Sequence, residues 1–362
     1  MTVSETLIQQ VRNICNISDA RHAGLYSVCG LALRLRDLFK WEKELFPWQE
    51  RDAKQVLDWI DAKEKVWETL EDQDYGMIFI EGEDFDPFDT KKINAVLEPF
   101  NLFYGAGYAY SLKPTFFLAP ILTRQEISGI TVFTLGHELA RDLLTLPALT
   151  QDNDIVLRTE AAKLYLWDQI TYIKRSSRPA LNMALSAMGI TSTDATLIKA
   201  HFEDIFQILR KNYIRHELGE IKEKTFDRRI WRELIAKFAH TPIELLARAI
   251  KDLLADTHTI GPLTRIVTKR DAVALGFYAA FLDGLGKQVF FRFIRAFGDF
   301  LQNANWSIVE QSVVQGREKA AAIARDMSAI FLEGQHRHDP KWTAAKIDRS
   351  ILAPLLKNNS NI

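Results

Sequence analysis

Cysteine is scarce in this sequence, with only Cys15 and Cys29 among 362 residues. So few cysteines exclude a dense disulfide framework and are typical of a protein from a reducing compartment. Long apolar runs are missing too, because the longest, residues 272–282, is too short to cross a bilayer. The opening residues contain neither a basic cluster nor an apolar stretch, so we expect no secretory signal. We therefore expect a cytoplasmic protein without a membrane segment.

The common nucleotide and nucleophile motifs are also lacking. There is no G-x-x-x-x-G-K-[ST] and no G-x-S-x-G, and the G-A-G of residues 105–107 has no third glycine. An acidic stretch, residues 71–89, has eight carboxylates but not the ligand spacing of an EF-hand. We interpret it as a solvated loop with a short edge strand at residues 77–80. None of these motifs assigns an activity.

Charge is unevenly distributed along the chain. Residues 1–150 carry 15 Lys/Arg and 23 Asp/Glu, a net charge of −8, whereas residues 151–362 carry 31 and 24, a net charge of +7. Opposite charge predicts either that the two halves dock on each other or that the second half binds an acidic protein partner. We favour docking of the two halves. Basic residues between 210 and 237 alternate with acidic ones, so nucleic-acid binding is not expected.

The hydrophobic pattern predicts a mostly α fold. In an α+β domain at residues 1–175, aromatic and β-branched residues indicate a three-stranded antiparallel meander near 102–134. An all-helical domain is expected at 179–335, since Pro179 disfavours a helix at Arg178. Residues 336–362 are predicted to form a C-terminal extension. His336 and His338 lie at its start, in a segment that we interpret as a linker. Helices are predicted at 4–14, 18–42, 52–70, 89–97, 136–144, 158–174, 179–188, 192–224, 226–239, 242–256, 270–283, 287–302 and 305–333.

A titratable pair, His216 and Glu220, lies in the apolar stripe of the predicted helix 192–224. A charge facing a core requires a partner or a bound ion. The pair would bind a divalent metal if other elements add ligands, with His201 and His258 as candidates. In a catalytic version, His216, Glu217 and Glu220 would be the acid–base residues. The interpretation that we favour is a core histidine hydrogen-bonded to Glu220, with Glu217 solvated.

The predicted helix 18–42 also carries polar residues on one face. Ser18 and Asp19 are expected to cap its first turn. His22 and Cys29 lie about two turns, or roughly 10 Å, apart, which is too far for a direct thiol–imidazole pair. We therefore interpret this segment as a packed central helix.

The sequence T-V-F-T-L-G-H-E-L-A-R-D-L-L, residues 131–144, resembles the ImmA/IrrE-type zincin metallopeptidases, and the likeness extends over residues 131–166. It implies a strand leading into an H-E-x-x-H helix with His137 and Glu138, and a later acidic ligand, Glu160. Arg141 occupies the place of the second histidine, and a guanidinium does not ligate zinc. We expect instead a short helix with a Glu138–Arg141 pair. A catalytically inactive relative of that scaffold is the other interpretation.

The chain as a whole resembles an uncharacterised family of bacterial cytoplasmic proteins with two domains of unknown function. Residues 4–15, 24–42 and 138–147 are the basis for this resemblance. It implies a fold family and no activity. We therefore predict a non-catalytic cytoplasmic binding or scaffold protein. The alternative is a metal-dependent hydrolase with either a degenerate zincin-like site or a helical metal site that uses His216 and Glu220.

Overall fold

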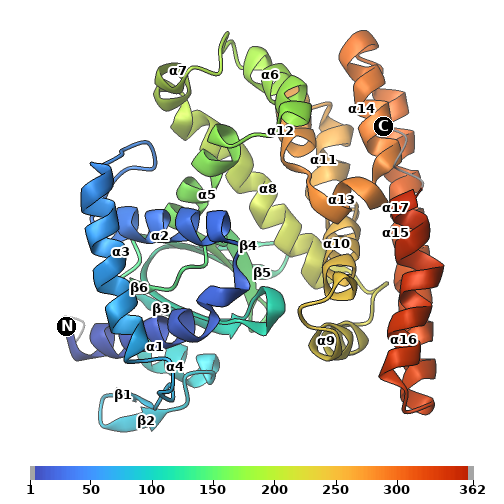
Figure 1. Cartoon of the computed structure of the whole chain (residues 1–362). Coiled ribbons are helices and arrows are strands. Elements are labelled where there is room, and N and C mark those ends of the chain that lie inside the picture. The colour runs from blue at the N-terminus through green and yellow to red at the C-terminus, as the bar shows by residue number, and fades with distance from the viewer. Residues whose placement is uncertain (1–4, 358–362) are drawn as a thin grey trace. The chain divides into compact units, whose positions relative to one another are not determined.

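The computed structural model describes residues 5–357. The chain forms two compact units, Met1–Asp168 and Gln169–Ile362 (Figure 1). The division falls inside helix α5 (Thr159–Thr171), whereas the sequence pattern favoured residues 176–179. Each unit is described by itself below.

The N-terminal unit begins with three helices, α1 (Glu5–His22), α2 (Val28–Glu42) and α3 (Ala53–Glu68). The single helix predicted at 18–42 is wrong, because α1 continues to His22 and a short 3₁₀ turn separates it from α2. Ser27 is the residue that caps α2, since its side chain accepts a hydrogen bond from the Gly30 amide. Ser18 and Asp19, which we expected to cap a helix, are buried on α1.

A six-stranded mixed sheet forms the centre of this unit. The predicted meander is present as β3 (Leu102–Tyr108), β4 (Pro114–Ile127) and β5 (Ile130–Leu135), paired antiparallel. The prediction was incomplete, because β8 (Asp154–Arg158) adds parallel to β5, and β7 (Ala148–Gln151) adds antiparallel to β8. The order is β3-β4-β5-β8-β7, and β6 (Ala140–Arg141) pairs with β4.

The helix predicted at residues 136–144 is wrong. Its amides bond to the neighbouring strand instead of to their own turn: Leu139 N donates to Leu118 O, and Ala140 lies opposite Leu118 in the β4–β6 register. The acidic and basic side chains of the segment enter buried ion pairs. These pairs hold the backbone extended against β4 although its local pattern favours a helix.

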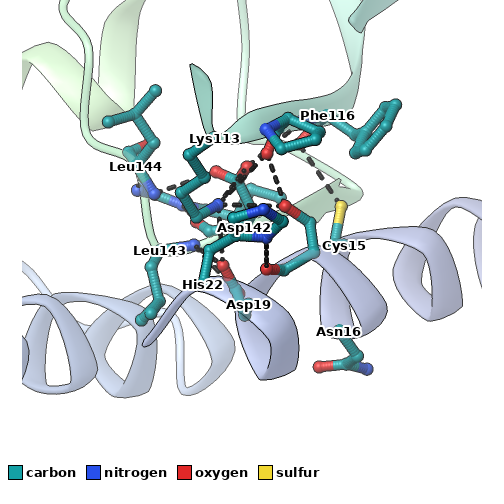
Figure 2. Close-up of polar contacts among 12 residues, drawn as sticks. Cys15, Asn16, Asp19, His22, Lys113, Phe116, Asp142, Leu143 and Leu144 are labelled. Atoms are coloured by element: carbon teal, nitrogen blue, oxygen red, sulfur yellow. Dashed lines mark hydrogen bonds and ion pairs between the residues drawn. The ribbon is translucent and has the colours of Figure 1, made fainter. Parts of the chain in front are cut away.

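Asp142 belongs to a buried network of three charges, which joins α1, the residue just before β4 and the segment after β6 (Figure 2). Lys113 Nζ lies 3.1 Å from both Asp19 Oδ1 and Asp142 Oδ2, and all three side chains are at most 2% exposed. Backbone amides of Leu143 and Leu144 donate to Asp19 and Asp142, respectively. Burial raises the pKa of Asp19 to about 6, although the Lys113 charge opposes the shift.

The remaining elements of this unit lie at its edge. The predicted edge strand is confirmed as β1 (Ile78–Ile80), and it pairs with β2 (Glu83–Phe85) inside the acidic stretch. Helix α4 (Thr90–Leu97) follows, and Asp89 caps it by accepting from the Lys92 amide. The apolar sides of α1, β1, α4 and β4 share one hydrophobic core.

The C-terminal unit is helical, and residues 169–357 contain no strand. Its helices are α6 (Arg178–Ala187), α7 (Ala195–Ala200), α8 (Phe202–Lys222), α9 (Arg228–Lys237), α10 (Pro242–Asp256), α11 (Pro262–Lys269), α12 (Ala272–Phe281), α13 (Gly284–Val289), α14 (Phe291–Asn303), α15 (Trp306–His336), α16 (Pro340–Ile347) and α17 (Ala353–Lys357).

The sequence pattern missed three features of this unit. The helix predicted at 192–224 is divided between α7 and α8, and α11 was not foreseen. The linker expected at His336 is wrong, because His336 ends α15 and the chain continues into α16 and α17. Throughout the described residues, the helices are too short or too polar to cross a membrane.

Candidate metal centre

The candidate site lies between α8 and α10, at a close approach of the two helices. A Cβ on Gly219 would lie 2.2 Å from the carbonyl oxygen of Ala255, so only glycine allows this contact. Residues one turn apart on each helix lie beside this crossing: His216 and Glu220 on α8, and residues 252 and 256 on α10. The glycine therefore brings two polar pairs together.

Three side chains converge at the crossing. His216, Glu220 and Asp252 each offer one ligand atom, and these atoms lie within 4.8 Å of one another. His216 Nε2 is 3.9 Å from Asp252 Oδ1. The sequence pointed to His216 and Glu220 but missed Asp252, which is 55% exposed and lies outside any apolar stripe. Its only sequence signal is the i, i+4 spacing of two aspartates, which matches that of His216 and Glu220.

Asp256 orients the imidazole. His216 Nδ1 donates to Asp256 Oδ1 over 2.7 Å, and the Tyr278 hydroxyl of α12 donates to Asp256 Oδ2 over 2.8 Å. With the Nδ1 proton held by Asp256, the other ring nitrogen, Nε2, is the one that faces Asp252. A carboxylate behind a histidine in this way fixes the tautomer that presents Nε2 to a metal.

The charges around His216 favour its protonated form. Burial lowers its pKa, but the charge and hydrogen bond of Asp256, followed by Asp252 and Glu217, raise it well above the usual 6.5. Desolvation, together with Glu220 and Asp256, raises the pKa of Asp252 to about 6, although His216 opposes the shift. A cation at this site would therefore compete with a proton for the imidazole.

The ammonium group of Lys251 already pairs with one of the candidate ligands, Glu220. Lys251 Nζ lies 2.5 Å from Glu220 Oε1 and 3.8 Å from the centroid of the Trp231 ring. Burial raises the pKa of Glu220, but Lys251, His216 and Arg228 outweigh it and hold the pKa below its usual value. A metal would therefore have to displace Lys251 from Glu220.

The other candidates of the C-terminal unit do not join this group. Glu217 is buried on α8, so the expectation that it is solvated is wrong. His201 precedes α8 and lies 3.8 Å from Asp204. His258 lies in the turn after α10, where its Nδ1 accepts from the Ile260 amide.

The candidates of the zincin-like segment each contact other side chains. His137 is exposed and stacks on Trp41 with ring centroids 6.2 Å apart. Glu138 is buried between Arg158 and Arg141, at 2.5 Å and 3.4 Å. Glu160, on α5, pairs with Lys163. The Glu138–Arg141 pair that we predicted exists, but no helix carries it, so the H-E-x-x-H geometry is not formed.

Comparison with protein families places this chain. Residues 6–158 match the N-terminal domain, and residues 163–350 the C-terminal domain, of a family of unknown function, DUF6866. The chain belongs to the DUF6866 family. The two-domain resemblance is thereby confirmed, and the family gives this DUF6866 protein no identifiable activity. Comparisons with curated proteins and with solved structures give no match.

Proposed function

We propose that this DUF6866 protein is a non-catalytic binding protein of the bacterial cytoplasm whose C-terminal unit binds a divalent metal ion. The observation that carries the proposal is the convergence of His216 Nε2, Glu220 and Asp252, with Asp256 holding the imidazole from behind. One imidazole nitrogen and two carboxylates suit zinc, manganese or iron(II). The cytoplasmic location is supported by two free cysteines, and the bacterial origin by the resemblance of residues 4–15, 24–42 and 138–147.

The three candidate ligand atoms lie near one another, but they are farther apart than the ligands of a bound metal ion. Ligand atoms at about 2.1 Å from a tetrahedral metal lie roughly 3.4 Å apart, whereas here they are spread over up to 4.8 Å. Small side-chain rotations bring them in, and Glu220 must also leave Lys251. We therefore expect metal binding to be weaker than at a preformed structural zinc site.

A metal-dependent hydrolase is the second candidate. Three protein ligands leave a fourth position for water, as catalytic zinc sites do. Asp252, at 55% exposure, gives solvent access to this position. This version uses the helical site, since Glu138 of the zincin-like segment is paired with two arginines and no helix carries it. Hydrolysis of ester or peptide substrates by the metal-loaded protein, lost in His216→Ala, would favour it.

Metal content tests the proposal. Untagged protein purified without chelator is to be analysed by inductively coupled plasma mass spectrometry, beside His216→Ala and a matched control, His201→Ala. Each variant removes one histidine from the region of α8, but only His216 belongs to the three-residue group. We expect near-stoichiometric metal in the wild type and in His201→Ala, and its loss in His216→Ala. No metal in any sample, even after loading with zinc or manganese, would refute the proposal.

A further inference from the structure

An open groove of about 550 Å³ runs between α11 and α15 in the C-terminal unit. Along α15 its lining extends from Glu310 to Arg325, which is roughly 22 Å of helix at 1.5 Å per residue. Its apolar lining consists chiefly of Val267 on α11 and of Val314 and Ala321 on α15. A groove of this length matches about four turns of a helix and is longer than a small ligand needs.

The polar side chains that line the groove are largely engaged within the unit. Thr257, Thr264 and Thr268 each donate the hydroxyl hydrogen to a backbone carbonyl. Arg317 is held by the carboxylate of Glu223, 2.6 Å away. The groove therefore offers few free hydrogen-bond donors to a polar ligand, and its shape favours a protein surface.

The solvent-facing side of α15 beside this groove carries charges without partners. Glu310, Glu318 and Arg325 are exposed, and within residues 5–357 none of them makes a hydrogen bond or an ion pair. Val314 lies among them and is 54% exposed. An apolar centre bordered by charged side chains is the anatomy of a protein–protein interface.

The order of these residues along α15 is self-complementary. Two copies of α15 can pack antiparallel about a two-fold axis that passes between residues 317 and 318. Glu310 of each copy then lies opposite Arg325 of the other, and Val314 lies opposite Ala321. A parallel pair would set Glu310 on Glu310 and Arg325 on Arg325, and like charges repel. The charge pattern therefore matches a second copy of this chain in the antiparallel direction.

We propose that this DUF6866 protein forms a two-fold symmetric dimer in which α15 of each copy lies antiparallel in the groove between α11 and α15 of the other. The small side chains of Val314 and Ala321 allow the two helices to approach closely. The two-fold axis repeats every contact, so the Glu310–Arg325 pair occurs twice. This interface uses none of the candidate metal ligands, so it is independent of the proposed metal binding.

Charge reversal followed by mixing tests this interface, with analytical ultracentrifugation of the full chain as the measurement. The variants are Glu310→Arg and Arg325→Glu. Alone, each variant sets like charges opposite each other at two places, whereas a mixture of the two variants restores opposite charges at both places. The control, Asp326→Arg, reverses an exposed charge of α15 outside the groove lining. Circular dichroism shows whether each variant keeps its fold.

We expect the wild type and Asp326→Arg to dimerise with Kd values within about twofold of each other. Each single reversal should raise the Kd roughly tenfold or more, because two attractive pairs become repulsive. The equimolar mixture of the two reversals should dimerise nearly as tightly as the wild type.

Three results would overturn the inference. The first is a wild type that remains monomeric at about 100 μM, where a dimer with a micromolar Kd would be formed. The second is a dimer that both single reversals leave unchanged, because its interface would then lie elsewhere. The third is a mixture of the two reversals that stays monomeric although both variants are folded. Each of these results leaves the proposed metal binding standing.

Discussion

Replacing Lys251 by methionine should tighten metal binding. The lysine ammonium is 2.5 Å from Glu220 Oε1, and the two side chains are 19% and 25% exposed. The metal must break this pair to reach its ligand. A hydrogen bond between charged groups in partly buried surroundings is worth about 1.5–3 kcal/mol. Because methionine keeps most of the aliphatic volume over Trp231, the substitution removes chiefly the competing charge.

The expected magnitude follows from that pair. A gain of about 1.5–3 kcal/mol corresponds to a roughly 10- to 150-fold lower Kd for zinc. Competition against a fluorescent zinc chelator measures it. Without metal, Lys251→Met should unfold at a lower temperature than the wild type, because Glu220 loses its partner, and zinc should restore the difference. The matched control is Lys222→Met, since Lys222 is on α8, is exposed and makes no contact with this group. Unchanged or weaker zinc affinity in Lys251→Met would refute the view that Lys251 competes with the metal.

Three further outcomes are expected. Gly219→Ala should destabilise the protein by about 1–3 kcal/mol in urea denaturation, because its Cβ would meet the Ala255 carbonyl. The control Gly298→Ala should not destabilise the protein in this way, because the space around Gly298 is open. Equal stability of the two variants would contradict the close helix crossing. Lys113→Met should cost about 3–5 kcal/mol, since two buried carboxylates lose their cation; a loss below about 1 kcal/mol in the same assay would argue against the buried network. The pKa of His216 is raised in the folded state, so the stability that it contributes to the metal-free protein is complete below its unfolded pKa of about 6.5 and is lost as pH rises through the folded value. Thermal unfolding across pH should show this loss in the wild type but not in His216→Ala, and identical pH profiles would refute the assignment.

The helical periodicity of α8 explains why sequence alone located half of the site. His216 and Glu220 fall in a stripe whose spacing is a local property of one helix, so both residues could be singled out. Asp252 became a candidate only through the contact of Gly219 with Ala255, a long-range approach that no local pattern reports. Asp256, at the end of α10, holds the imidazole through the same long-range approach of the two helices.

The sheet of the N-terminal unit also depends on long-range contacts that a local sequence pattern does not report. Strands β3, β4 and β5 are joined by short turns and were predictable from composition. The parallel pairing of β8 with β5 connects segments separated by an irregular stretch, and it depends on contacts made elsewhere. In that stretch, residues 136–144 have a helical pattern that is overridden because Glu138 pairs with Arg158 and Asp142 with Lys113. Buried charge partners distant in sequence therefore decided the local structure.

A crystal structure of the zinc-loaded protein, with anomalous diffraction data at the zinc edge, tests the central claim most directly. The account predicts one strong anomalous peak in the C-terminal unit, about 2.0–2.2 Å from His216 Nε2 and from oxygens of Glu220 and Asp252. It also predicts that Lys251 has moved off Glu220. Zinc bound elsewhere, or no peak at the α8–α10 crossing while Lys251 remains on Glu220, would contradict it.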